Sequence, residues 1–183
     1  MRRYRIDSET TSYYFSTCTI VEWLCVFKEE KYFQIIVESL NYCREKKGLF
    51  LLGLVIMLNH IHLITSNRDE TNLSDIMRDF KRYTSTKIAA ELEEDNEKLF
   101  LYVFRKAAER QGKKSKYKIW KDDFHPEALY SQKWFNQKMN YLHANPERKG
   151  LVIKPEDWKY SSARNWILDD HSVITLDLDI LTV

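Results

Sequence analysis

Glycine, proline, cysteine and long apolar runs are all scarce in this sequence of 183 residues. Four glycines and three prolines are too few for a collagen-like, linker-rich or largely disordered chain. No apolar run approaches the roughly 18–20 residues of a bilayer span, and the charged start leads into the polar stretch Asp7–Ser12. We therefore expect neither a membrane helix nor a signal peptide. Three cysteines without a Cys-x-x-Cys spacing indicate free thiols in a reducing cytoplasm.

Aromatic residues are abundant, at 14% of the chain, and positive charge is concentrated in one part of it. Residues 101–166 carry 15 Lys and Arg against 7 Asp and Glu, whereas residues 1–100 carry 14 against 16. Basic side chains interleaved with aromatic rings suit a nucleic-acid surface, because cations bind phosphates and flat rings stack on unpaired bases. A solvated face over an aromatic core explains the same figures. The composition therefore permits a nucleic-acid partner without requiring one.

The periodicity of apolar residues predicts a single α+β domain over residues 1–183. Strands are expected at 12–21, 50–57, 60–65 and 117–121, and amphipathic helices at 29–46, 73–88 and 131–145. This order indicates a ferredoxin-like antiparallel sheet with helices on one face, followed by a C-terminal helix. The other face of the sheet is left for a ligand or another element.

Several residues are expected to mark the ends of these elements. We expect Gly48 to end the first helix and Pro146 to end the last. Thr71 or Asn72 is expected to cap the second helix. The polar segment 91–118 is predicted to be an insertion without a core of its own, and residues 167–183 a C-terminal tail.

His60-Ile61-His62 is the sharpest local feature of the sequence. Side chains alternate along a strand, so both imidazoles would share one face while Ile61 points into the core. Two imidazoles one pleat apart can bind a divalent metal ion. A half-buried strand whose polar residues face water gives the same pattern, so the spacing alone leaves both interpretations open.

A second cluster falls on the helix expected at 131–145. Tyr141 and Asn145 are four residues apart and therefore share a face, with Lys138 on the same side. An ordinary phenol is a weak nucleophile at neutral pH, so chemistry at Tyr141 would need a metal or a cation beside it. A ring packed at the edge of the core is the plainer interpretation. His143 lies about 200° around the helix from Tyr141 and is expected to pack or to face solvent.

Five stretches of the chain, taken in order, resemble the successive signatures of one family. They are IMLNHIHLI, LSDIMRDFKRYTSTKI, IWKDDFHPE, QKMNYLHANPERKGLV and EDWKYSSARNW. On these motifs, which fall within residues 10–166, the chain resembles the single-tyrosine HUH transposases, and within them the REP-associated, IS200-like group. Five ordered motifs are far more specific than His-x-His alone. Leu58 departs from the proline that the family usually has before the histidines, and leaves both histidines in place.

The resemblance implies a role for four residues. His60 and His62 match the paired histidines that bind Mg²⁺ or Mn²⁺, and Asn145 matches the polar residue that completes that metal site. Tyr141 matches the nucleophilic tyrosine of the Tyr-x-x-x-Asn-Pro helix. The implied cofactor is Mg²⁺ or Mn²⁺, although two imidazoles would also accept Zn²⁺ or Ni²⁺ in vitro.

The implied activity is metal-dependent nicking and joining of single-stranded or hairpin DNA. The tyrosine would form a 5′-phosphotyrosine, which a different 3′-hydroxyl could resolve without nucleotide hydrolysis, and the sequence has no GxxxxGK[ST] loop. Two alternatives stay open: a domesticated protein that binds DNA hairpins without cutting them, and a metal-dependent phosphodiesterase that uses water. The sequence also leaves open a monomer or a homodimer, and hence whether the tyrosine serves its own histidines or a partner's.

Other basic and aromatic residues are weaker candidates for DNA contacts, because surface Lys and Arg are common and tryptophans often anchor cores. The basic candidates are Arg78, Lys81, Arg82, Lys113, Lys114, Lys116 and Lys138. The candidates for base stacking are Trp120, Trp134, Trp158 and Trp166. We expect residues 158–162 to pack the C-terminal segment back onto the domain.

Overall fold

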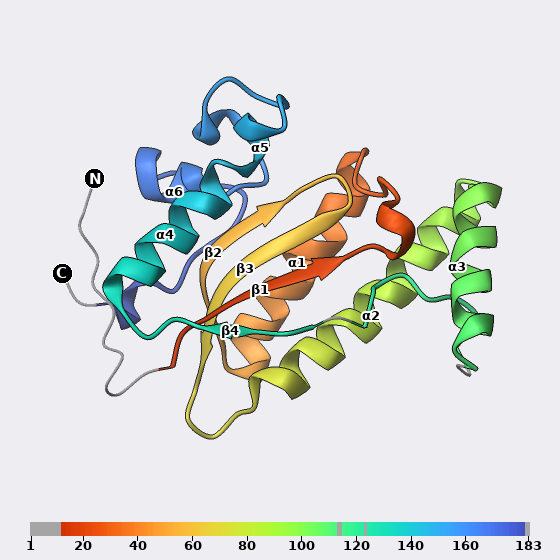
Figure 1. The fold of residues 1–183 in the computed structure, drawn as a ribbon, viewed down its shortest axis with the longest axis horizontal. Coiled ribbons are helices and arrows are strands. Elements are labelled where there is room, and N and C mark those ends of the chain that lie inside the picture. The colour runs from red at the N-terminus through yellow and green to blue at the C-terminus, as the bar shows by residue number, and fades with distance from the viewer. Residues whose placement is uncertain (1–11, 113–114, 123, 182–183) are drawn as a thin grey trace.

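The structure, a computed structural model, describes residues 12–112, 115–122 and 124–181. A four-stranded sheet lies between helices (Figure 1). The strands are β1 (Tyr14–Thr19), β2 (Leu49–Ile56), β3 (His60–Asn67) and β4 (Glu127–Ala128). The helices are α1 (Glu30–Lys47), α2 (Leu73–Glu94), α3 (Lys98–Arg110), α4 (Gln132–His143), α5 (Asn145–Arg148) and α6 (Ala163–Leu168), with short 3-10 turns η1 (Val21–Trp23), η2 (Pro155–Asp157) and η3 (Leu178–Ile180). Among the described residues, no helix is long and apolar enough to cross a bilayer.

The sheet is antiparallel, with the strand order β2-β3-β1-β4. The register of β1 with β3 sets His60 opposite Thr19 and His62 opposite Thr17. Directly opposite residues of an antiparallel pair share a face of the sheet. The two histidines and the two threonines therefore lie on the same side.

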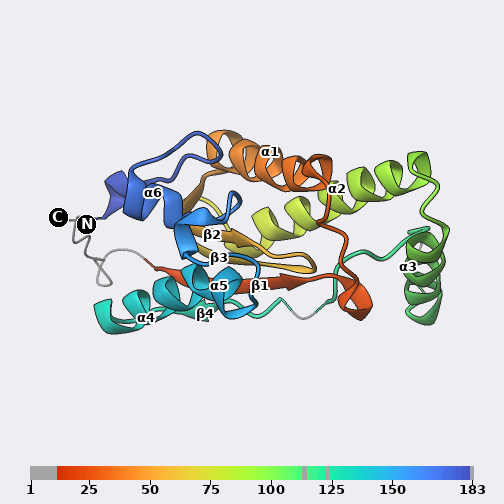
Figure 2. The ribbon, with the colours of Figure 1, turned by 90° about the horizontal axis from the view of Figure 1, so that it is seen from above.

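α1 and α2 cover one face of the sheet and bury the larger apolar cluster (Figure 2). Leu40 of α1 and Phe80 of α2 are both buried in it. α1 ends as predicted at Gly48, whose φ of 76° is a left-handed conformation that glycine adopts without strain. Of the two possible caps of α2, Asn72 is the one that accepts backbone hydrogen bonds.

α4 lies on the other face, where its apolar stripe of Phe135, Met139 and Leu142 is buried in a second cluster. Gly53 of β2 allows this close approach, because a Cβ there would lie only 3.0 Å from the sulfur of Met139. The pairing of β2 with β3 is also irregular between Leu51 and Gly53, a β-bulge that bends the strand here. Contact with the bent strand fixes where the last turn of α4 meets the sheet.

Residues 158–162 pack against β2, as predicted. Ser161 forms a β-bridge with Val55. The indole N–H of Trp158 donates to the carbonyl of Ile56 at 2.9 Å. This segment holds the C-terminal part of the chain beside the sheet.

Two local predictions are wrong. Residues 117–121 form no strand, and only Trp120 makes an isolated bridge, with Ile20. β1 ends at Thr19 and η1 begins immediately after Ile20, which leaves no further partner; the edge strand is β4 instead. Pro146 does not end the helical path but begins α5, because a proline fits the first turn of a helix, where its missing N–H is not needed.

The segment 91–118 contains the end of α2 and the whole of α3. Phe104 and Ala108 of α3 are buried, and Phe104 belongs to the larger apolar cluster. α3 therefore packs on the common core through one side of the helix.

Candidate active site

His60 and His62 lie side by side on β3, on the sheet face that α4 covers. The centroids of their rings are 4.7 Å apart, and the residues are 9% and 5% exposed. Phe15, on the neighbouring strand, stacks against His62 with centroids 5.3 Å apart. Ile61 is buried in the larger cluster on the opposite side, so the alternation predicted for this strand is confirmed.

Hydrogen bonds determine which nitrogen of His60 carries the proton. The side-chain N–H of Asn59 donates to the carbonyl of Trp23 at 3.1 Å, which turns the amide oxygen of Asn59 toward His60. That oxygen lies 2.7 Å from Nδ1 of His60 and can only accept, so the proton is on Nδ1. The Nε2 atom of His60 is left with its lone pair.

His62 is held in a similar way from the strand beside it. The hydroxyl of Thr17 lies 2.8 Å from Nδ1 of His62. The Nε2 atom of His62 is buried without a hydrogen-bond partner in the described part of the chain. A buried polar atom in that state costs free energy unless a ligand occupies it. The Nε2 atom of His60 is therefore of the kind that binds metals, and so is that of His62 when the Thr17 hydroxyl accepts from Nδ1.

Burial keeps both imidazoles neutral. Removal from water lowers the pKa of His60 to about 4, with a smaller contribution from the charge of Lys149. It lowers the pKa of His62 to about 3, with smaller contributions from His60 and Lys138. At neutral pH both rings can thus bind a cation without first losing a proton.

α4 places Tyr141 beside the histidines of the same chain. The centroid of its ring lies 5.4 Å from that of His62, with the two planes at 67°, and 6.0 Å from that of Phe15. Tyr141 is 40% exposed, in contrast to the buried imidazoles. Tyr141 is therefore partly open to solvent while its ring contacts that of His62.

Asn145 lies one helical turn after Tyr141, at the start of α5. Ala144, between α4 and α5, keeps a right-handed helical conformation, so Tyr141 and Asn145 remain on one face. Asn145 is buried. No group of three His, Cys, Asp or Glu suited to a metal occurs among the residues that the structure describes. A metal at the two histidines would therefore need another kind of donor, such as the amide oxygen of Asn145.

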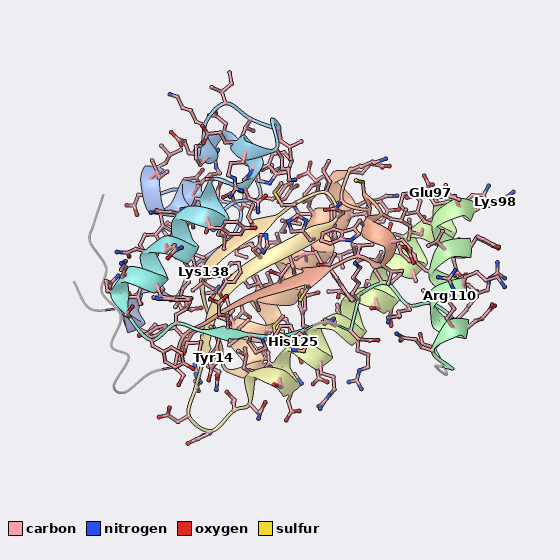
Figure 3. The ribbon with its side chains drawn as sticks, viewed as in Figure 1. Tyr14, Glu97, Lys98, Arg110, His125 and Lys138 are labelled. Carbon is pink, nitrogen blue, oxygen red and sulfur yellow. The ribbon has the colours of Figure 1, made fainter. Side chains whose placement is uncertain are left out.

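Cationic side chains surround this cluster. The guanidinium of Arg148 lies 5.2 Å from the ring centroid of Tyr141. The ammonium of Lys138, which is labelled in Figure 3, lies 4.8 Å from the ring centroid of Phe15. Lys149 follows at the end of α5. Only Lys138 was expected from the sequence, but Arg148 is seven residues after Tyr141, a spacing that returns to the same helix face and would have indicated it.

Every basic candidate that is described already has a partner. The ammonium of Lys138 lies 2.6 Å from a carboxylate oxygen of Glu127 on β4. Arg78 pairs with Asp75, Arg82 with Asp79 and Lys116 with Glu93, and Lys81 donates to the carbonyl of Lys121. Arg78, Lys81 and Arg82 lie on α2, the helix over the opposite face of the sheet. Lys113 and Lys114 lie outside the described residues.

His143 packs in the core, which is one of the two positions expected from the sequence. Its Nε2 atom lies 2.9 Å from the hydroxyl oxygen of Ser162, and its ring centroid lies 6.4 Å from that of Trp166. Burial lowers the pKa of His143 to about 4. His143 therefore belongs to the packing of the C-terminal segment.

Comparison with known proteins relates the chain to one protein family and to solved structures. The profile of the family described as "Transposase IS200 like" matches residues 23–119. Among solved structures, the chain is similar to a REP-associated tyrosine transposase bound to a REP hairpin, with a TM-score of 0.57 and 18% identity over 88% of this chain and 81% of that chain. This second likeness shows the fold, an antiparallel four-stranded α+β sheet with helices. No match was found among curated proteins.

Proposed function

The chain belongs to the IS200-like transposase family, and we propose that it nicks and joins DNA through a covalent tyrosine intermediate. The family match includes His60 and His62 but ends before Tyr141. The role of Tyr141 therefore depends on the contact between its ring and that of His62 within one chain. This contact is the observation that carries the proposal.

Mg²⁺ or Mn²⁺ is the proposed cofactor. The Nε2 atoms of His60 and His62 and the side-chain oxygen of Asn145 would hold it. When bound, the cation polarises the scissile phosphate and offsets the charge that develops there. Asn59 and Thr17 orient the two rings from the Nδ1 side and so aim the Nε2 atoms at the site.

Tyr141 supplies the nucleophile. Its phenolic oxygen bonds to phosphorus while the bond from phosphorus to the 3′ oxygen of the preceding nucleotide breaks. The phenol releases its proton to solvent, and the departing 3′ oxygen takes one up. The products are a 5′-phosphotyrosine and a free 3′-hydroxyl, so a different 3′-hydroxyl can reverse the step and join strands without nucleotide hydrolysis.

The cations around the site would bind the DNA backbone. Arg148, Lys138 and Lys149 lie close to the rings of the site, where a phosphate must come to react. Guanidinium and ammonium groups form strong, charge-assisted hydrogen bonds with phosphate oxygens. These side chains would thus fix the position of the DNA strand. The scaffold that carries them is ferredoxin-like in its order of β-strands and helices.

Single-stranded or hairpin DNA is the proposed substrate. The structurally similar transposase is bound to a REP hairpin. The recessed imidazoles favour an unpaired strand, which can bend a single phosphate into the site more readily than a duplex can. Because Tyr141 lies beside histidines of its own chain, the site does not require a second copy.

The proposal is tested by incubating 5′-labelled and 3′-labelled DNA hairpins with the protein and Mn²⁺, followed by denaturing electrophoresis. We expect a covalent adduct that carries the DNA 3′ of the nick. Tyr141→Phe removes this adduct, whereas Tyr130→Phe, at an exposed tyrosine just before α4, retains it. An adduct that persists in Tyr141→Phe overturns the assignment.

The same experiment separates the alternatives. Hairpin binding without cleavage in any divalent metal would identify a non-cleaving binding protein. Cleavage that survives Tyr141→Phe without protein-bound DNA would identify a phosphodiesterase that uses water.

A further inference from the structure

Trp23 is an exposed aromatic residue at the edge of the site. It is 55% exposed, and the centroid of its ring lies 6.1 Å from that of His60 with the planes at 77°. It lies in η1, between β1 and α1. No pattern in the sequence singled it out, although its indole borders the metal-binding histidines proposed above.

The backbone holds Trp23 in this position at a cost in free energy. Glu22 and Trp23 have φ values of 54° and 56°, so two consecutive residues other than glycine are in the left-handed region. Such a conformation is strained for a bulky residue and persists only where surrounding contacts impose it.

Contacts with Ile20, with Asn59 of the turn between β2 and β3, and with α3 impose the conformation. The N–H of Trp23 donates to the carbonyl of Ile20 at 3.0 Å, and its carbonyl accepts from the side chain of Asn59. Glu22 pairs with Arg110, at the end of α3, at 3.6 Å (Figure 3). The result is a rigid turn that keeps a large apolar ring in solvent, which packing alone does not explain.

A cation accompanies the ring. The ammonium of Lys121 lies 4.4 Å from the ring centroid of Trp23. The ammonium lies over one face of the ring, so an unpaired base would stack on the other face while the cation binds a neighbouring phosphate.

We propose that Trp23 is a stacking platform for an unpaired base of the DNA strand next to the phosphate that Tyr141 attacks, with Lys121 binding a neighbouring phosphate. This inference rests on the proposed function. Stacking of this kind tolerates any base, so Trp23 would position the strand and not read its sequence. It therefore acts as a positioning residue.

The test measures binding of fluorescein-labelled oligothymidylate by anisotropy, with EDTA present so that no cleavage occurs. We expect Trp23→Ala to weaken binding by about 5- to 150-fold, the range for loss of one base–aromatic stack. Trp23→Phe retains most of the affinity because a flat ring remains. Tyr42→Ala is the matched control, because Tyr42 is 56% exposed on α1 at the opposite face of the sheet, and it leaves the affinity unchanged.

Trp23→Gly adds a readout that a merely structural role would not produce. Glycine relieves the left-handed strain, so this variant is expected to melt at the same or a higher temperature than the wild type while binding DNA more weakly. Wild-type affinity in Trp23→Ala, or an equal loss in Trp23→Ala and Trp23→Phe, overturns the inference. Weaker binding by Trp23→Ala together with no covalent adduct in the wild type would uphold the platform and reject the cutting step.

Discussion

Thr17 contacts the site through its hydroxyl group, 2.8 Å from Nδ1 of His62. Thr17→Val keeps the volume of the side chain and removes the hydrogen bond that orients the imidazole. Loss of such a supporting contact typically lowers metal affinity about 10- to 100-fold. We expect a loss of this size for Mn²⁺, measured by electron paramagnetic resonance of the free ion during a titration.

The control for this change is another buried threonine in the same sheet. The hydroxyl of Thr65 on β3 has no hydrogen-bond partner within the described residues, so Thr65→Val should leave Mn²⁺ affinity unchanged. Equal Mn²⁺ affinity in Thr17→Val and the wild-type protein would show that the Thr17 hydroxyl does not orient His62.

Some site residues could be predicted from the sequence because their relation is local. The two-residue period of a strand puts His60 and His62 on one face, and the helical period puts Tyr141 with Asn145. Trp23 could not be predicted in this way. Its side chain is exposed because Glu22 and Trp23 have left-handed φ values. Neither the composition nor the spacing of residues predicts such values in residues other than glycine.

At the scale of elements, local sequence patterns did not predict that α4 packs next to β3. It depends on a long connection after α2, on the bulge of β2 and on the close approach of Met139 to Gly53. The prediction of a strand at 117–121 was wrong for a related reason. Strand pairing there is decided by where β1 ends, and not by the residues of the segment itself.

Gly53→Val tests how far the position of α4 controls the site. Branched methyl groups at this position would press on Met139 and push α4 away from the sheet. We expect the free energy of unfolding in urea to fall by about 1–3 kcal/mol, as for other overpacked cores, and adduct formation at Tyr141 to slow. Gly53→Ala is the milder comparison, because its Cβ is tight only against the flexible end of Met139 and meets the Cβ of Ile64 at an ordinary 3.4 Å.

Gly53→Val should therefore have a lower free energy of unfolding and slower adduct formation than Gly53→Ala. Adduct formation at the wild-type rate in a folded Gly53→Val protein would contradict the view that this contact places Tyr141.

The C-terminal segment has a pH-sensitive contact at Asp170. Hydrogen bonds from the backbone and hydroxyl of Ser172, and then from Arg164, lower the pKa of Asp170 to about 2 from its usual 3.8. A lowered pKa in the folded state means that the carboxylate stabilises the fold at pH 4 and above, and that this contribution is lost as the pH falls toward 2. We expect Asp170→Asn to be less stable than the wild type at pH 7 in urea denaturation, with the difference vanishing near pH 2.

Asp169→Asn provides the comparison for this contact. The side chain of Asp169 is 90% exposed, and its carboxylate lies 3.4 Å from His171, so its removal should change little at either pH. A stability difference between Asp170→Asn and the wild type that stays constant from pH 7 to pH 2 would contradict the titration argument.

At the scale of the whole molecule, the sheet separates two surfaces on which positive charge is used differently. On α2, Arg78 and Arg82 pair with acids of their own helix. On the other face, Lys138 pairs with Glu127 at 2.6 Å, while Arg148 and Lys149 lie near the rings of the site. The formal net charge of +2 is too small to hold a polyanion by itself, so the local arrangement decides where a DNA strand would lie.

The salt dependence of DNA binding distinguishes these two surfaces. Each phosphate contact to a single strand contributes about 0.7 to the slope of log affinity against log salt concentration. In a Tyr141→Phe background that prevents cleavage, Lys149→Ala should therefore reduce the slope for oligothymidylate by about 0.7. Arg78→Ala should leave the slope unchanged, since its guanidinium already pairs with Asp75 at 2.5 Å. A slope that falls in Arg78→Ala and not in Lys149→Ala would place the DNA on the α2 face, away from the histidines and the tyrosine.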